Sequence, residues 1–199
     1  MRCDNFFICI TLLQIKIILK IIEKKKLKKD KCVLLFYSTK ISKSEKYYLA
    51  KIRPYCKKII VLRNKIAFPF YFFRIKKKFK NYTIKNAYIS NLNGIYVQYL
   101  MSITKPDKIF TFDDGAGNLY KNTEYNIGED FNFFKKLIYF FLGNKYSSKR
   151  LIKERMNHFT IFKNYKNYSS KKKIKLNLFK NKKKIYFKKK NYCNIILGT

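Results

Sequence analysis

The chain has 199 residues, of which 47 are Lys or Arg and 11 are Asp or Glu, so its formal net charge is +36. A hydrophobic content of 47% provides enough apolar side chains for the core of one good-sized domain. A single histidine excludes a His-based metal cluster, and five dispersed cysteines without C-x-x-C spacing argue against a disulfide framework or a zinc site and fit a reducing compartment.

Short apolar runs alternate with amphipathic stretches through the first 112 residues. Strands are expected at 5–10, 31–37, 58–62, 86–90 and 108–112, and helices at 12–26, 42–52, 69–79 and 93–104. Thr11 is a suitable N-cap for the first helix, while Pro54 and Pro106 end the second and the fourth. The alternation predicts a doubly wound α/β sheet of parallel strands with right-handed crossovers.

The apolar stretch at 6–22 can be interpreted as a membrane anchor, as a signal peptide, or as a strand followed by a helix. It is interrupted by Gln14, Lys16 and Lys20, and the two lysines share one helical face. A membrane span needs about 20 predominantly apolar residues, and a signal peptide needs a small-residue cleavage site. A strand that leads into an amphipathic helix fits better, with an uncleaved anchor as the alternative.

Two adjacent acids follow the strand expected at 108–112. Asp113 and Asp114 stand out in so basic a chain, and Gly115 and Gly117 just after them allow a sharp turn and a close approach of the backbone. The carboxyl ends of strands in open α/β sheets are where ligands bind. A ligand site is therefore one interpretation of this loop, and a turn capped by one of the acids is the other.

The second part of the chain is less regular. Helices are expected at 130–142 and 147–155, followed by a short extended run at 158–162. The range 163–190 is rich in Lys, Asn and Tyr, has a weak pattern, and is interpreted as a linker or exposed connection. The expected organisation is a domain at 1–165, a basic linker at 166–192, and the first strand of a second domain at 193–199, where the chain is cut.

Four ordered blocks carry a family resemblance. They are an opening strand and turn, an acidic-glycine block, a His-aromatic-Thr-Ile block and a final Ile-Ile-Leu-Gly-Thr, at residues 5–14, 111–119, 158–163 and 195–199. Together they resemble bacterial glycosyltransferase family 52, the lipooligosaccharide α-2,3-sialyltransferase family. The resemblance implies a GT-B architecture of two Rossmann-like domains. It also implies inverting transfer of sialic acid from CMP-sialic acid to a terminal galactose of lipooligosaccharide, with no metal or other cofactor.

The same resemblance suggests site residues. Asp114, and after it Asp113, are the catalytic candidates, because related sialyltransferase families place a catalytic Asp of an Asp-Asp-Gly sequence in such a loop. Substrate contacts are expected at Thr11, Gln14, Gly115, Asn118 and His158. Each has a plainer alternative: Thr11 caps a helix, Gln14 packs, Gly115 shapes the loop, and a lone histidine beside an apolar run is more often structural.

One departure from the family pattern limits the prediction. In the family, the proposed general base and general acid come from a Leu-Gly-Ser/Thr-Pro-Asp turn and a His-Pro motif of the second domain, and the sequence stops at Thr199 before both. The resemblance therefore implies little or no transferase activity for these 199 residues alone. The alternatives are a non-catalytic remnant or binding half-domain, and a family member that uses another sugar donor.

The net charge by itself suggests nucleic acid as a partner. However, the lysines are spread along the whole chain among Ile, Asn, Phe and Tyr, as an A/T-rich coding sequence would give, and neither an aromatic-glycine RNA-binding box nor helix-turn-helix spacing is present. We therefore expect no specific nucleic acid. Contact with an anionic membrane follows from the charge, and the resemblance predicts a cytoplasmic protein, peripheral at the inner face of the bacterial inner membrane. The resemblance also allows a homodimer.

Overall fold

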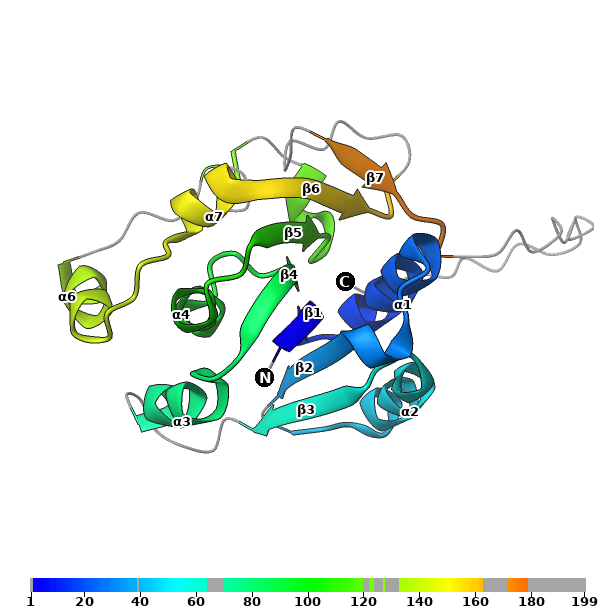
Figure 1. The fold of residues 1–199 in the computed structure, drawn as a ribbon. Helices are drawn as coiled ribbons and strands as arrows, with labels where there is room; N and C mark the ends of the chain where they lie inside the picture. Colours follow the sequence, from blue (N-terminus) through cyan, green and yellow to red (C-terminus); the bar gives the residue numbers. More distant parts are fainter. Residues whose placement is uncertain are drawn as a thin grey trace, which may run out of the picture.

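The fold is an α/β sheet covered by helices on both faces (Figure 1). The computed structural model describes residues 2–38, 40–63, 70–119, 122–123, 127, 133–162 and 172–178. Within these ranges one seven-stranded sheet has the order β3-β2-β1-β4-β5-β6-β7, and each neighbouring pair is parallel. The predicted α/β sheet of parallel strands is confirmed, and it is consistent with a Rossmann-like domain. The GT-B architecture of two domains stays a prediction.

The strands expected in the first half of the chain are all present. The sheet contains β1 (Arg2–Cys9), β2 (Cys32–Ser38), β3 (Lys58–Arg63), β4 (Thr83–Ile89), β5 (Lys108–Phe112), β6 (Arg155–Thr160) and β7 (Lys173–Lys175). Strand β6 starts three residues earlier than the extended run expected at 158–162, because the chain passes directly from a helix that ends at Glu154 into the strand.

Six α-helices lie within the described ranges, close to the predicted positions. They are α1 (Leu12–Lys25), α2 (Lys43–Ile52), α3 (Phe70–Phe79), α4 (Ile95–Thr104), α6 (Phe133–Phe141) and α7 (Ser148–Glu154), with short 3-10 turns η1 (Lys29–Lys31), η2 (Arg53–Tyr55) and η3 (Ala116–Leu119). Thr11 caps α1 and Ser42 caps α2, each through a capping box in which the N3 side chain bonds back to the cap.

Two apolar cores lie on opposite faces of the sheet. Helices α1 and α2 cover one face through residues such as Ile18 and Ile52, which pack with Phe36 of β2. Helices α3 and α4 cover the other face through residues such as Phe72 and Leu100 (Figure 1). Because β2 and the second half of β1 are buried on both faces, their sequences are continuous apolar runs rather than alternating ones.

The stretch interpreted as a linker contains a strand. Of the range 166–192 the structure describes 172–178, where Lys173–Lys175 pairs with His158–Thr160 as the edge strand β7. A three-residue Lys-Ile-Lys strand has almost no sequence pattern, because its order comes from pairing with β6. The proposed division at 165 and 192 stays a prediction, and the strand expected at 193–199 lies outside the described residues.

The apolar stretch at 6–22 forms β1 and most of α1, as expected. Helix α1 packs Ile15, Ile18 and Ile22 onto the sheet and turns its charged side outward. Among the described helices, none combines the length and apolarity that a membrane crossing requires.

Candidate functional site

The carboxyl ends of the parallel strands meet at one edge of the sheet, and most of the predicted site residues lie there. The strand order changes direction between β1 and β4, and in open α/β sheets ligands bind outside the carboxyl ends of the strands at such a point. Thr11 and Gln14 follow β1, and Asp113, Asp114 and Gly115 follow β5. Segments that are 100 residues apart in the sequence are thereby brought together.

Gln14 connects the start of α1 to the acidic loop. Its side chain is buried, and its amide Nε2 donates a hydrogen bond to Oδ1 of Asp114. Its Oε1 accepts from the backbone N–H of Ile10 at 2.6 Å and of Thr11 at 3.3 Å, while the Thr11 hydroxyl accepts from the Gln14 N–H at 3.3 Å. One amide side chain thus completes the helix cap and fixes the orientation of the Asp114 carboxylate. The capping role predicted as an alternative for Thr11 is confirmed.

Three groups at this edge remain accessible. Asp114 and Gly115 are half-buried, and Thr11 is exposed at the tip of β1. Gly115 has a φ of +137°, a backbone conformation that L residues rarely adopt, and among the described residues no atom beyond its two chain neighbours lies within 4 Å of the position its Cβ would take. A glycine is therefore required at 115 by the backbone rather than by packing against the described residues.

Asp113 points the other way, into the protein. It is 0% exposed, and its Oδ1 lies 2.8 Å from Nε2 of His158 while its Oδ2 accepts from the backbone N–H of Ile161 at 2.7 Å. The Thr111 hydroxyl lies 2.9 Å from Nδ1 of the same histidine. Thr111, His158 and Asp113 thus form a buried network between β5 and β6, and this geometry favours the structural alternative for His158.

The chemistry of the partners fixes the hydrogen positions in this network. An ionised carboxylate only accepts, so Nε2 of His158 donates to Asp113, and Nδ1 of the neutral ring accepts from the Thr111 hydroxyl. Burial lowers the pKa of His158 below its ordinary value, although Asp113 opposes this, and the positive charges of Arg155 and Lys173 lower it further. The ring is therefore neutral at physiological pH.

Tyr96 is a site residue that the sequence reasoning missed. It lies in the first turn of α4, its ring stacks on Tyr37 with centroids 4.3 Å apart, and its buried hydroxyl has no hydrogen-bond partner among the described residues. Burial raises the pKa of Tyr96 well above its ordinary value, and the negative charge of nearby Asp114 raises it further. In the sequence it reads as an ordinary core position of an apolar helix, since an unpartnered hydroxyl leaves no sequence signal.

Other predicted features contribute less to this edge. The side chain of Asn118 lies outside the described part of the structure, although its backbone belongs to η3. Four cysteines (Cys3, Cys9, Cys32 and Cys56) are buried free thiols, and Cys193 lies outside the described residues. Burial raises the pKa of each of these thiols, to about 12 for Cys56, which disfavours the reactive thiolate form. The described ranges hold no group of three or more metal-ligating side chains.

Comparison with known proteins gives two relatives and one family. The family model for glycosyltransferase family 52 matches residues 29–199. The N-acetyllactosaminide alpha-2,3-sialyltransferase of Haemophilus influenzae is 29% identical over 171 residues, which cover 83% of this chain and 55% of that protein. The CMP-N-acetylneuraminate:beta-galactoside alpha-2,3-sialyltransferase of Pasteurella multocida is 30% identical over 166 residues, which cover 82% of this chain and 53% of that protein. The chain spans about half the length of these relatives.

Proposed function

Because the chain belongs to glycosyltransferase family 52, we propose that it provides the acceptor-binding part of an α-2,3-sialyltransferase. The proposed reaction transfers sialic acid from CMP-sialic acid to a β-galactoside, the terminal galactose of lipooligosaccharide. Both relatives are named for this linkage, and one name states the donor and the β-galactoside acceptor. The observation that carries the acceptor assignment is the half-buried carboxylate of Asp114, held by Gln14 at the carboxyl edge of the sheet.

The chemistry of a sugar suits this edge. Sugar hydroxyls donate and accept hydrogen bonds, and a carboxylate makes the stronger, charge-assisted bond to a hydroxyl. Gln14 holds Asp114 before a ligand arrives, so little reorganisation is needed on binding. The exposed Thr11 is a second polar contact in this proposal. Asp113 is fully buried and bonded to His158 and to the backbone of Ile161. In this proposal it shapes the loop and does not touch the sugar.

Sugar transfer also needs groups beyond acceptor binding. A base must take the proton of the attacking hydroxyl, and an acid or a cation must help the CMP phosphate to leave. In the family these are a Leu-Gly-Ser/Thr-Pro-Asp turn and a His-Pro motif, and neither full motif occurs in these 199 residues, whose one Pro-Asp pair is Pro106-Asp107 before β5. We therefore assign acceptor binding to these residues and expect the 199-residue chain by itself to show little or no transfer. The proposal includes metal-independent transfer in the cytoplasm, which the family resemblance supports.

Acceptor binding can be tested on the chain itself by saturation-transfer NMR with N-acetyllactosamine. We expect signals from the galactose ring, and we expect Asp114→Asn to weaken binding roughly tenfold or more, because a hydrogen bond to a charged group contributes about 1.5–3 kcal/mol. Asp107→Asn is the matched control, since Asp107 is exposed at the opposite end of the same strand β5. Equal binding by the wild type and Asp114→Asn would remove Asp114 from the site.

A separate assay tests whether the chain by itself transfers sialic acid to the acceptor or only binds the acceptor. The purified chain is incubated with CMP-sialic acid and N-acetyllactosamine, with and without EDTA, and the sialylated product is measured. We expect little or no product from the chain alone. Efficient transfer would show that the catalytic groups lie within these 199 residues and would overturn the assignment to acceptor binding only.

A further inference from the structure

The first turn of α4 contains backbone donors that lack an acceptor. Gly94, the N-cap of this ten-residue helix, has no side chain that could cap it, and no acid lies in the first turn. The N–H groups of Ile95 and Tyr96 have no acceptor among the described residues. The first N–H groups of an α-helix have no partner within the helix, so a capping side chain, water or a ligand must bind them.

The phenol hydroxyl of Tyr96 adds a further donor at the same place. The Tyr96 side chain is 8% exposed, and its hydroxyl oxygen is buried without a partner among the described residues. Side chains of a helix lean toward its N-terminus. The edge of the Tyr96 ring lies 3.1 Å from the position that a Cβ on Gly94 would take. The ring therefore folds back beside the start of the helix, where the glycine leaves room for it.

The start of α4 is held in place and remains accessible. The side-chain oxygen of Asn91 accepts from the Gly94 N–H at 2.8 Å, and Nε2 of Gln98 donates to the carbonyl of Leu92 at 2.7 Å. Gly94 and Ile95 are half-buried. Because α4 follows β4, its first turn lies at the carboxyl edge of the sheet, beside the point where the strand order changes direction. These donors are therefore fixed before a ligand arrives.

The charge nearby favours a neutral group on the ligand. Donors at a helix N-terminus suit an oxygen that only accepts hydrogen bonds, as in a phosphate, a carboxylate or a carbonyl group. Burial, and then the negative charge of Asp114, raise the pKa of the Tyr96 hydroxyl, so Asp114 acts on this position electrostatically. An anion bound here would be repelled by Asp114. A neutral carbonyl oxygen fits better, and in sugars it belongs to an N-acyl group such as acetamido.

We propose that the N-terminus of α4, together with the Tyr96 hydroxyl, binds the acetamido group of an N-acetylated amino sugar next to the acceptor galactose. The acetamido oxygen accepts from the donors of the first turn. Its methyl group packs beside the stacked rings of Tyr37 and Tyr96, whose centroids are 4.3 Å apart. This inference rests on the proposed function, which places galactose beside Asp114, and it adds a contact that distinguishes acceptors with the same galactose.

N-acetyllactosamine and lactose are a matched pair of ligands, because they differ only by an acetamido group in place of one hydroxyl. We expect the wild type to bind N-acetyllactosamine about threefold to tenfold more tightly, which is the contribution of one neutral hydrogen bond. In ¹⁵N NMR, N-acetyllactosamine should shift the amide signals of Ile95 and Tyr96 more than lactose does. Equal affinity for the two sugars would overturn the acetamido contact and leave galactose binding intact. Failure of both to bind would contradict the proposed function, and this inference with it.

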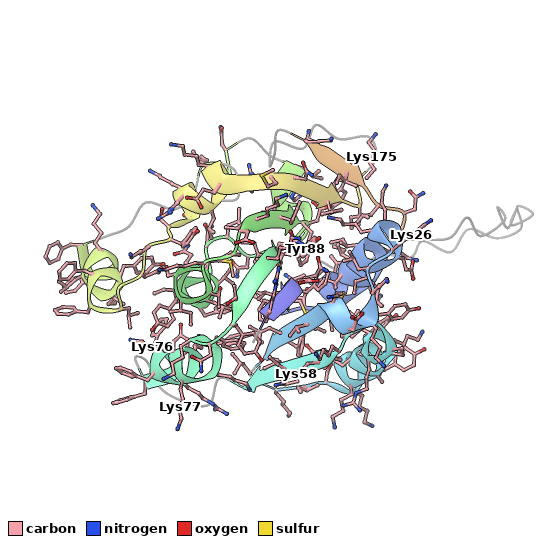
Figure 2. The ribbon with its side chains drawn as sticks, viewed as in Figure 1. Lys26, Lys58, Lys76, Lys77, Tyr88 and Lys175 are labelled. Carbon is pink, nitrogen blue, oxygen red and sulfur yellow. The ribbon has the colours of Figure 1, made fainter. Side chains whose placement is uncertain are left out.

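Tyr96→Phe tests the hydroxyl. We expect this variant to bind N-acetyllactosamine more weakly and lactose as before, so that the preference for N-acetyllactosamine falls about threefold or more. Tyr88→Phe is the control, because Tyr88 lies in β4 within the sheet (Figure 2) and its hydroxyl is bonded to Lys25. It should keep the wild-type preference. A Tyr96→Phe variant with the wild-type preference would overturn the role of the hydroxyl.

Gly94→Ala tests the space at the start of the helix. The φ of −66° is open to alanine, but the added Cβ would lie 3.1 Å from the Tyr96 ring and 3.2 Å from the Asn91 side chain. Because these side chains must move, we expect the preference for N-acetyllactosamine to fall. An unchanged melting temperature would show that the fold is intact, and an unchanged preference in that folded variant would contradict the proposed geometry.

The sugar that is transferred carries an acetamido group as well, so a further titration identifies the source of the group. The methyl glycoside of N-acetylneuraminic acid is added in place of N-acetyllactosamine, and the amide signals of Ile95 and Tyr96 are followed. We expect N-acetyllactosamine to shift these signals at lower concentration than the glycoside. Shifts caused by the glycoside alone would assign this subsite to the transferred sugar and overturn its assignment to the acceptor.

Discussion

Asp113 and His158 face each other inside the protein, with Oδ1 and Nε2 2.8 Å apart and the two side chains 0% and 1% exposed. The next residue along the chain, Asp114, is half-buried and bonded to Gln14 at the sheet edge. Two consecutive carboxylates therefore have opposite environments: one joins β5 to the segment after β6, and the other remains partly open to solvent. The stability of the loop and its binding of a ligand can be separated by substitution.

Asp113→Asn is expected to destabilise the fold without a direct effect on the edge. The amide N–H of the variant would face either His158 or Ile161, which both donate, so one buried hydrogen bond is lost at a cost of about 1–3 kcal/mol. Urea unfolding measures this free energy. Asp107→Asn, exposed at the other end of β5, should change it by less than about 0.5 kcal/mol. An Asp113→Asn variant as stable as the wild type would contradict the inferred network.

Stability should fall in acid through the only histidine of the chain. The pKa of His158 is lowered in the folded state, so as the pH drops below the ordinary value of 6.5 the unfolded chain takes up a proton that the folded chain resists. Above that pH both states are neutral, and the contribution is constant. We expect the melting temperature of the wild type to decrease from about pH 7 to about pH 5.5, and the slope to be smaller in His158→Gln. Equal slopes would show that another group dominates.

Much of the fold could be predicted because its signals are local. Continuous apolar runs such as Cys32–Ser38, the cap at Thr11 and the turn after β5 depend on neighbouring residues in sequence. Strand β7 could not be predicted, because three residues with exposed lysines gain their order from β6. The apolar side of α6, exposed at Phe140 and Phe141, has the same periodicity as a buried one, so the sequence does not show that it faces solvent.

The location of the site could be predicted from the sequence, but the contacts between its side chains could not. Acids after a strand and polar residues after another imply a shared edge, and Asp114 meets Gln14 there. Which of the two acids turns inward depends on a partner 45 residues away, since His158 can only be placed once β6 is paired with β5. The unpartnered hydroxyl of Tyr96 likewise results from tertiary packing alone.

The capping boxes of α1 and α2 allow a Gln–Glu exchange to be compared at a predicted site residue and at an exposed control position. Gln14→Glu keeps the oxygen that accepts from Ile10 but places a carboxylate against Asp114, and Glu45→Gln makes the reverse change in the exposed box of α2. We expect Gln14→Glu to lower stability by about 1–3 kcal/mol and to weaken N-acetyllactosamine binding about tenfold. Glu45→Gln should leave binding unchanged and stability within about 0.5 kcal/mol.

Urea unfolding and saturation-transfer NMR on both variants measure these two quantities. Equal effects of the two substitutions on binding would mean that Gln14 acts only as a helix cap.

Tyr96→Phe should separate ligand binding from folding. The buried hydroxyl has no partner among the described residues, so the folded protein bears the cost of its desolvation, about 1–3 kcal/mol, without a compensating bond. Its removal should leave the melting temperature unchanged or raise it. If the hydroxyl bonds a sugar beside Asp114, N-acetyllactosamine binding should weaken by roughly threefold to tenfold.

Tyr88→Phe is the control, because its buried hydroxyl accepts from Nζ of Lys25 at 3.0 Å, so its loss should cost about 1 kcal/mol of stability and leave binding unaffected. The same chemical change is thus expected to weaken sugar binding without loss of stability at Tyr96, and to lower stability without loss of binding at Tyr88. A Tyr96→Phe variant that loses stability but binds the sugar normally would show that this hydroxyl serves the fold and would remove Tyr96 from the acceptor site.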